Sequence, residues 1–228
     1  MIKDMQEDYA RQVAAAGLEI GAIKLRPDNP FTWASGFRMP IYNDNRMFLF
    51  HPKHRRLITS GLKSLSNLVS FEVIAGTSTA GISPATSLAD NLGCPLIYVR
   101  DKPKDHGLRS QIEGIDSEKD LSGRDVLLIE DLISTGGSSA KAVQAIRQAK
   151  GNCYFCISIF NYGLDEGAKA FDALEPKCKL LSVLTYDTLL EVAKARDYIT
   201  PQQAEMLAEW RQDPFGWGQK HGFPKVER

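Results

Sequence analysis

The sequence predicts an α/β protein whose mainly parallel sheet carries helices on both faces. Three observations lead to this prediction. Short apolar runs typical of strands alternate with segments of helical periodicity from residue 71 onward. The run at 126–129 is apolar at every position, as in a parallel strand that is buried on both faces. Small polar residues follow two of these strands and lead into helices, as in the βα turns of such sheets.

The expected elements follow from periodicity and turn residues. Two amphipathic helices come first, at 4–18 and 51–67. The strands that should form the sheet lie at 71–75, 96–99, 126–129, 152–160 and 179–184. The helices that alternate with them or close the chain lie at 82–91, 138–150, 166–174, 186–196 and 201–211. This alternation favours parallel pairing, because a helix between two strands returns the chain to the end of the sheet at which the first strand began. The next strand then runs in the same direction.

The composition is that of an ordinary globular protein. The 28 basic and 28 acidic residues cancel, and 43% of the residues are hydrophobic. A balanced charge leaves no electrostatic footprint for nucleic acid, so we expect no nucleic-acid partner. No apolar run approaches the roughly 18 residues of a membrane span, and the charged first residues lack the apolar centre of a signal peptide. We therefore expect a cytoplasmic protein with no membrane partner.

Two of the four cysteines, Cys153 and Cys156, have the C-x-x-C spacing of many zinc sites. They lie in an expected strand, with no second pair and no histidine nearby. Residues three apart on a regular strand also point to opposite faces. We therefore expect buried, reduced thiols and no zinc site.

The most informative segment is 126–139, which runs VLLIEDLISTGGSS. Glu130 and Asp131 follow at the expected end of a buried strand, where unpaired carboxylates would be costly. The acids can accept hydrogen bonds from sugar hydroxyls, while N–H groups of the next loop and helix can hold a phosphate. The loop comprises Leu132, Ile133, Ser134, Thr135, Gly136, Gly137 and Ser138. It lacks both the Gly-Lys-Ser/Thr of a Walker A loop and the G-x-G-x-x-G of a dinucleotide site.

Segment 126–139 resembles the ribose-phosphate signature of the type I phosphoribosyltransferases, which use phosphoribosyl pyrophosphate (PRPP). The resemblance implies that pyrophosphate is the leaving group. A second strand leads into small polar residues at 76–81, and by the same physics this turn is a candidate pyrophosphate cradle. Its candidate binding residues are Thr77, Ser78 and Thr79.

The polar connection 101–124 is the candidate lid of this site. It has 11 charged residues among its 24, which predicts a mobile segment rather than packing on the core. Arg100, Lys102, Lys104 and His106 form a cationic cluster at its start. These cations could close over pyrophosphate and exclude water, and His106 could also donate a proton to it.

Residues 30–46, here called the hood, run PFTWASGFRMPIYNDNR. The FTxxSG and PIYxDxR patterns, with the lid core RxxxKxHG, resemble the orotate phosphoribosyltransferases. The resemblance covers residues 20–190 or so and implies that orotate and PRPP form orotidine 5′-monophosphate and pyrophosphate. It implies Mg²⁺ as cofactor, bridged by PRPP with no direct protein ligand. It further implies a homodimer in which each lid reaches the site of the neighbouring subunit.

The resemblance also assigns roles residue by residue. Arg100, Lys104 and His106 would meet pyrophosphate, Glu130 and Asp131 would hold the ribose hydroxyls, and these five would be catalytic. The loop 132–138 would hold the 5′-phosphate. The residues expected to contact orotate are Ser134, Ser35, Gly36, Tyr42 and Arg46.

The chain also departs from the family pattern. Ala34, Ala80 and Asp101 stand where many members have lysine, and Asn161-Tyr162 replaces an expected base-contacting arginine. The cation that meets the orotate carboxylate therefore stays open between Arg46 and Arg38. Arg46 could instead anchor the hood through a salt bridge.

Two other functions remain open at this point. A purine phosphoribosyltransferase could share the ribose-phosphate loop, but the hood and lid sequences disfavour it. A non-catalytic regulator that senses PRPP is disfavoured by the lid cations and, if it bound nucleic acid, by the balanced charge. We divide the chain into an N-terminal helix and hood (1–50), a core (51–200) with its lid at 100–124, and a C-terminal helix and tail (201–228) loosely assigned to the hood.

Overall fold

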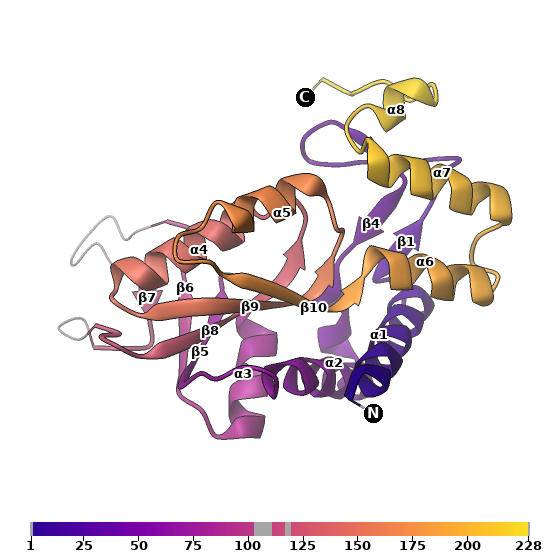
Figure 1. The fold of residues 1–228 in the computed structure, drawn as a ribbon. Helices are drawn as coiled ribbons and strands as arrows, with labels where there is room; N and C mark the ends of the chain where they lie inside the picture. The colour runs from indigo at the N-terminus through magenta and orange to yellow at the C-terminus, as the bar shows by residue number, and fades with distance from the viewer. Residues whose placement is uncertain (1, 103–110, 117–119, 228) are drawn as a thin grey trace.

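A six-stranded sheet organises the computed structural model, which describes residues 2–102, 111–116 and 120–227 (Figure 1). The strand order is β10-β9-β8-β5-β6-β7. All neighbours pair in parallel except β6 and β7. The strands are β5 (Val73–Thr77), β6 (Leu96–Val99), β7 (Ile112–Glu113), β8 (Asp125–Ile133), β9 (Asn152–Asn161) and β10 (Lys179–Thr185). The prediction of a mainly parallel sheet is confirmed.

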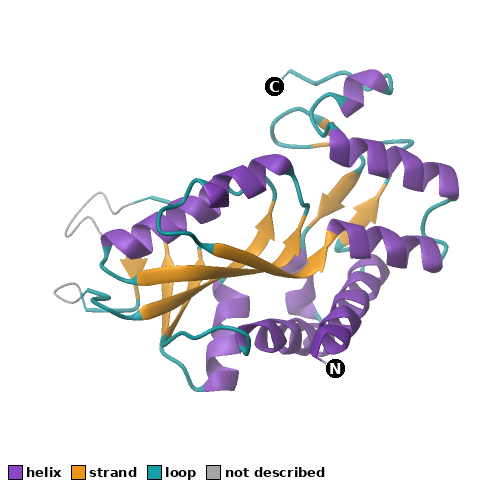
Figure 2. Ribbon diagram, in the orientation of Figure 1, coloured by secondary structure: helices purple, strands orange, loops and turns teal. Residues whose placement is uncertain are grey.

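Helices cover both faces of this sheet, as predicted (Figure 2). One face packs against α1 (Ile2–Glu19), α2 (Pro52–Ser66) and α3 (Ile82–Leu92). The other face packs against α4 (Gly137–Gln148) and α5 (Asp165–Asp172). Alternate residues of β8 enter the two apolar clusters, with Leu127 on one side and Leu128 on the other. Strand β8 is therefore buried on both faces, which explains its continuous apolar run.

Strand β8 is longer than predicted and contains the acidic pair. It pairs with β5 only as far as Ile129, but with β9 as far as Ile133. Glu130 and Asp131 therefore lie inside the strand, on the part that β5 no longer flanks. The expectation that the strand ends before the acids is wrong, because pairing with β9 alone continues the extended backbone.

The connection between β6 and β8 packs on the core at both of its described ends. Residues 112–113 form β7, antiparallel to β6, and Ile112 is 6% exposed. Leu121 is 2% exposed and belongs to the same apolar cluster. The expectation that the whole connection lies off the core is therefore wrong for these ends. Residues 103–110 and 117–119 lie outside the described residues, so the lid itself stays a prediction.

Cys153 and Cys156 lie in the same apolar cluster, together with Cys178. All three thiols are buried and free, as expected. The expectation of opposite faces is wrong, because the pairing register of β8 with β9 shifts between Asp125 and Leu127 and gives β9 an extra residue there. Burial raises the pKa of the Cys156 thiol, which keeps it protonated.

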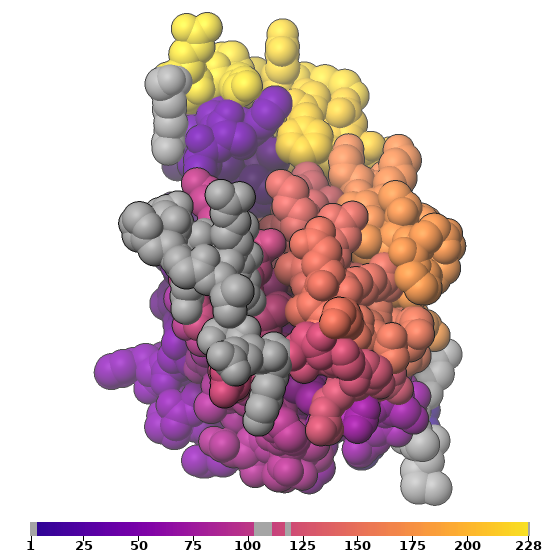
Figure 3. All heavy atoms as spheres, turned by 90° about the vertical axis from the view of Figure 1, so that its left-hand side faces the viewer, coloured from indigo at the N-terminus to yellow at the C-terminus, as the bar shows by residue number. Residues whose placement is uncertain are grey.

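The hood is built from short strands that the C-terminal segment covers. Within it, β2 (Phe31–Thr32) pairs with β3 (Arg38–Met39), and β4 (Ile41–Asn43) pairs with β1 (Ile23–Leu25), which precedes the hood; both pairs are antiparallel. The covering helices are α7 (Pro201–Gln212), which reaches Met39 through Trp210, and α8 (Trp217–Lys220), which packs on β3. Helix α6 (Tyr186–Ala195) precedes them and packs on α1. Figure 3 shows the C-terminal residues (yellow) lying against N-terminal residues (purple) at the top of the molecule.

Two fully buried tryptophans fix the C-terminal segment against the hood. The Nε1–H of Trp210 donates to the sulfur of Met39 at 3.1 Å, and its ring meets that of Trp33 edge-on at 6.4 Å. Trp217 is 1% exposed. Large aromatic side chains of this kind contribute most of the burial at such contacts. Within the described residues, no helix combines the length and the apolar character needed to cross a membrane.

Candidate active site

The Glu130 carboxylate is held by three donors from three elements. Oε1 accepts the hydroxyl of Thr77 at 2.7 Å and the N–H of Asp131 at 2.9 Å. Oε2 accepts the hydroxyl of Ser139 at 2.6 Å. Glu130 is only 8% exposed, so these hydrogen bonds replace the water that burial removes. Thr77 comes from β5 and Ser139 from α4, which fixes the carboxylate in one orientation.

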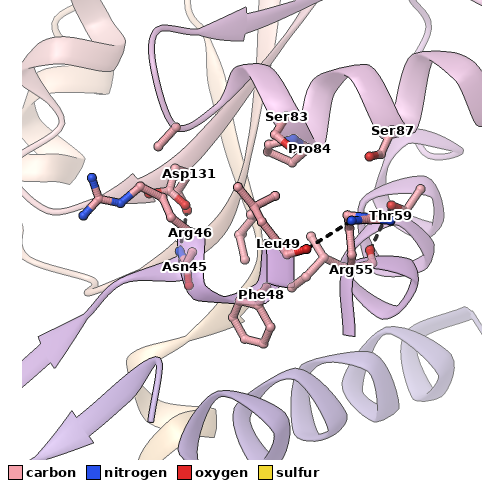
Figure 4. A pocket seen from close by; sticks show the side chains of 13 residues that line it. Asn45, Arg46, Phe48, Leu49, Arg55, Thr59, Ser83, Pro84, Ser87 and Asp131 are labelled. Carbon is pink, nitrogen blue, oxygen red and sulfur yellow. Dashed lines mark hydrogen bonds between the residues drawn. The ribbon is translucent and has the colours of Figure 1, made fainter. Parts of the chain in front are cut away.

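Asp131 lies in a different environment from Glu130. Its backbone carbonyl accepts the side-chain N–H of Asn45 at 3.0 Å, which ties it to the 3-10 helix η1 (Asn45–Phe50). Burial raises the pKa of Asp131 to about 6. Figure 4 shows Asn45, Arg46 and Asp131 together at one end of a pocket beside α3. The two adjacent acids are therefore not equivalent, because one is clamped and the other is readily protonated.

The predicted phosphate loop forms the connection from β8 to α4. Leu132 and Ile133 still belong to β8, and Ile133 is buried in the core, so the turn itself begins at Ser134. Gly136 has a φ of 71° and is the N-cap of α4. A Cβ there would lie 3.2 Å from the backbone of Gly167, so the position favours glycine for two reasons. The free N–H groups of the first turn of α4 can bind an anion.

A polar cavity of about 470 Å³ opens in front of Glu130 and α4. The predicted residues that line it are Thr77, Ser78, Arg100, Lys102, Glu130 and Ser138. The Arg100 guanidinium lies 3.3 Å from the Glu113 carboxylate. Thr79 does not line this cavity. Lys104 and His106 lie outside the described residues.

Lys141 is a cation of this cavity that the sequence reasoning missed. It follows Ser138 by three residues on α4, so both side chains lie on the same face of the helix. That spacing from the phosphate loop is the signal that could have revealed it.

A second cavity, of about 430 Å³, is bounded by the hood and by the end of β8. It contains three of the residues predicted to contact the base, Ser35, Tyr42 and Ser134. Its other walls are Thr32, Trp33, Ala34, Asn43, Leu132 and Tyr162. These walls suit a flat ring, and none of the described residues that line it is a cation. Burial raises the pKa of Tyr162, so its hydroxyl stays neutral.

Three other candidates for base contact lie outside this cavity. Arg46 forms a two-pronged ion pair with Asp44, two residues earlier, with nitrogen–oxygen distances of 2.7 and 2.9 Å, and its side chain is 65% exposed. The guanidinium of Arg38 donates to the carbonyl of Pro30 at 2.8 Å. Gly36 has a φ of 83°, and its carbonyl accepts the N–H of Val226.

The described part of the chain offers no group of three or more His, Cys, Asp and Glu side chains that could hold a metal ion. The described carboxylates that line the polar cavity are those of Glu130 and Asp101, while Asp131, next to Glu130 in β8, lines the pocket beside α3. Mg²⁺ commonly binds through one or two carboxylates together with substrate phosphates. The acidic pair fits such a shared role without forming a protein-only metal site.

The fold and the two cavities beside the acidic strand define a phosphoribosyltransferase, and residues 51–180 match the family model described as the phosphoribosyl transferase domain. Orotate phosphoribosyltransferase from Listeria innocua is 46% identical over 91% of this chain and 98% of its own. The enzyme of that name from Cutibacterium acnes is 44% identical over 94% and 97%. The crystal structure of orotate phosphoribosyltransferase from Aeropyrum pernix superposes with a TM-score of 0.68 at 28% identity, covering 82% of this chain and 99% of that one. The chain belongs to the orotate phosphoribosyltransferase family.

Proposed function

We propose that this protein transfers the phosphoribosyl group of PRPP to orotate, giving orotidine 5′-monophosphate and pyrophosphate. One observation carries the proposal: the segment 130–138 lines two cavities of different chemistry. The polar cavity has cations and hydroxyls suited to phosphates, and the hood cavity has aromatic walls suited to a pyrimidine. The relatives named orotate phosphoribosyltransferase support orotate over a purine as the acceptor, and catalysis over a purely regulatory role.

The residue roles proposed here combine these cavities with the family resemblance. Arg100 and the turn at 77–79 would bind pyrophosphate, together with Lys104 and His106. The first turn of α4 and the loop before it would hold the 5′-phosphate. Orotate would contact Ser35, Tyr42 and Ser134, which line the hood cavity. The geometry supports Gly36 as a structural residue of the hood rather than as a contact of the base.

The mechanism needs positioning and charge more than covalent chemistry. As the bond from ribose C1 to pyrophosphate breaks, the sugar gains positive charge, which the carboxylates of Glu130 and Asp131 can offset. The buried hydroxyl contacts keep Glu130 in place before the substrate arrives, so little reorganisation is needed. Mg²⁺, when bound, would neutralise charge on the departing pyrophosphate.

A direct assay tests the acceptor. Purified protein with Mg²⁺ and PRPP is mixed in turn with orotate, uracil and adenine, and the ultraviolet spectrum is followed. We expect consumption of orotate alone. Consumption of adenine alone would favour the purine alternative, and a lack of turnover with all three bases would favour the regulator.

We also propose that two copies of the chain form a homodimer with exchanged lids. Three apolar side chains of η1 are exposed on either side of the buried Phe48: Met47 by 36%, Leu49 by 41% and Phe50 by 87%. Such exposed apolar side chains support a contact surface at η1. Leu49 lines the same pocket as Arg46 and Asp131, so a partner seated there would be close to the acidic pair.

Mixing two inactive variants tests lid exchange. Lys104→Ala damages the lid and Asp131→Asn damages the body of the site. If each lid serves the partner, a mixed dimer has one doubly damaged site and one intact site. Random pairing then restores about one quarter of the wild-type activity, because half of the dimers are mixed. Activity no higher than that of the separate variants, in a mixture shown to exchange subunits, would refute the exchange.

A further inference from the structure

Ser139 stands apart from the substrate cavities and yet makes the shortest contact to Glu130. It is 1% exposed and lines neither the polar cavity nor the hood cavity. Its hydroxyl donates to Glu130 Oε2 at 2.6 Å. The other carboxylate oxygen faces Thr77 and the backbone of Asp131. Ser139 is thus the single described donor to Oε2.

In the described part of the chain, Glu130 forms no ion pair with a cation. Its buried carboxylate oxygens are satisfied by hydrogen bonds instead. The Thr77 hydroxyl donates to one oxygen and the Ser139 hydroxyl to the other, which fixes the plane of the carboxylate.

The position of Ser139 in α4 gives this contact a second consequence. Ser139 is the third residue of the helix, directly after the loop proposed to hold the 5′-phosphate. The same rigid turn therefore carries the phosphate-binding N–H groups and the group that orients Glu130.

We propose that Ser139 is a positioning residue that keeps the Glu130 carboxylate correctly oriented toward the ribose of PRPP. The inference rests on the proposed function. It concerns the sugar end of the site and leaves the choice of base unchanged.

The main test compares Ser139→Ala with Ser158→Ala. Ser158 is an equally buried serine on the adjacent strand β9, but its hydroxyl bonds with that of Ser182 at 2.8 Å. We expect Ser139→Ala to lower kcat/KM for PRPP roughly 10- to 100-fold, the loss of one hydrogen bond to a charged group. The KM for orotate should stay near the wild-type value.

Ser139→Thr and Ser139→Val supply a second pair of nearly equal shape, of which only Thr keeps the hydroxyl. We expect the Thr variant to retain most of the activity and the Val variant to match Ala. The inference is overturned if Ser139→Ala keeps the wild-type kcat/KM for PRPP, if Ser158→Ala lowers it equally, or if Thr and Val behave alike. A wild-type protein that makes no orotidine 5′-monophosphate would instead overturn the proposed function, so the two failures are distinguishable.

Discussion

Replacement of Asp131 by asparagine should make the folded protein more stable at neutral and alkaline pH while removing its activity. Burial raises the pKa of Asp131 from 3.8 to about 6. The folded state therefore prefers the neutral form, whereas at pH 8 the side chain is ionised in both states. Asparagine is nearly the same shape as the protonated acid and carries no charge, so it avoids this cost.

The size of this difference in stability follows from the pKa of Asp131. At about 1.36 kcal/mol for each pKa unit, a rise from 3.8 to about 6 corresponds to about 3 kcal/mol at most. Because the pKa is raised on folding, protonation of Asp131 stabilises the folded state fully below pH 3.8, the pKa in the unfolded chain. This stabilisation is lost as the pH rises through about 6, the pKa in the folded protein. The advantage of the asparagine variant should thus approach its maximum at pH 8 and fall to roughly half at pH 5.

Urea unfolding of wild type and Asp131→Asn at pH 5 and pH 8 measures this difference. Asp90→Asn, which removes an exposed acid on α3, controls for the change in net charge. The reasoning is refuted if Asp131→Asn is less stable than wild type at pH 8, or if its advantage is the same at both pH values. In turnover assays the variant should lose kcat more than orotate affinity, and wild-type turnover would refute the role of the acid.

Three further predictions concern the lid, the hood and the tail. Lys104→Ala should lower kcat while leaving the KM for orotate nearly unchanged in steady-state assays, and wild-type turnover would argue against its contact with pyrophosphate. Tyr42→Ala should raise the KM for orotate roughly three- to ten-fold through the loss of an aromatic wall; an equal rise in the KM for PRPP would argue against a base-specific role. Gly36→Ala should lower the free energy of unfolding by at least about 1–3 kcal/mol, since its new Cβ would lie 2.3 Å from the carbonyl oxygen of Val226. Gly93→Ala is the control, with a φ of 67° but no atom within 4 Å, and an equal loss would show that strain alone is responsible.

The pattern of apolar and polar residues along the sequence was enough to predict the core of the fold. The apolar run at 126–129 and the alternating helices correctly predicted a parallel sheet with helices on both faces. Patterns of two or three residues were too short to predict β7 or the small strands of the hood. The cysteine pair shows the same limit, because one extra residue in β9 placed both thiols in one cluster.

The candidate site, like the fold, was predicted from the sequence only in part. The phosphate loop and the acidic pair are contiguous in the sequence, so their residue types alone indicated their chemistry. The cavities are not contiguous, and neither the cationic Lys141 nor the wall formed by Tyr162 was predicted. The absence of a described cation from the hood cavity also came from the fold.

The sequence by itself determined the sheet, the turn that can hold a phosphate, and the family to which the chain belongs. These depend on local periodicity and on neighbouring residues, which a linear chain records directly. The tertiary structure decided how each acid is used. Glu130 is clamped by Thr77 from 53 residues away, and Asp131 is tied to Asn45 from 86 residues away. Such contacts arise only when strand register and helix packing bring distant segments together, and no local pattern specifies them.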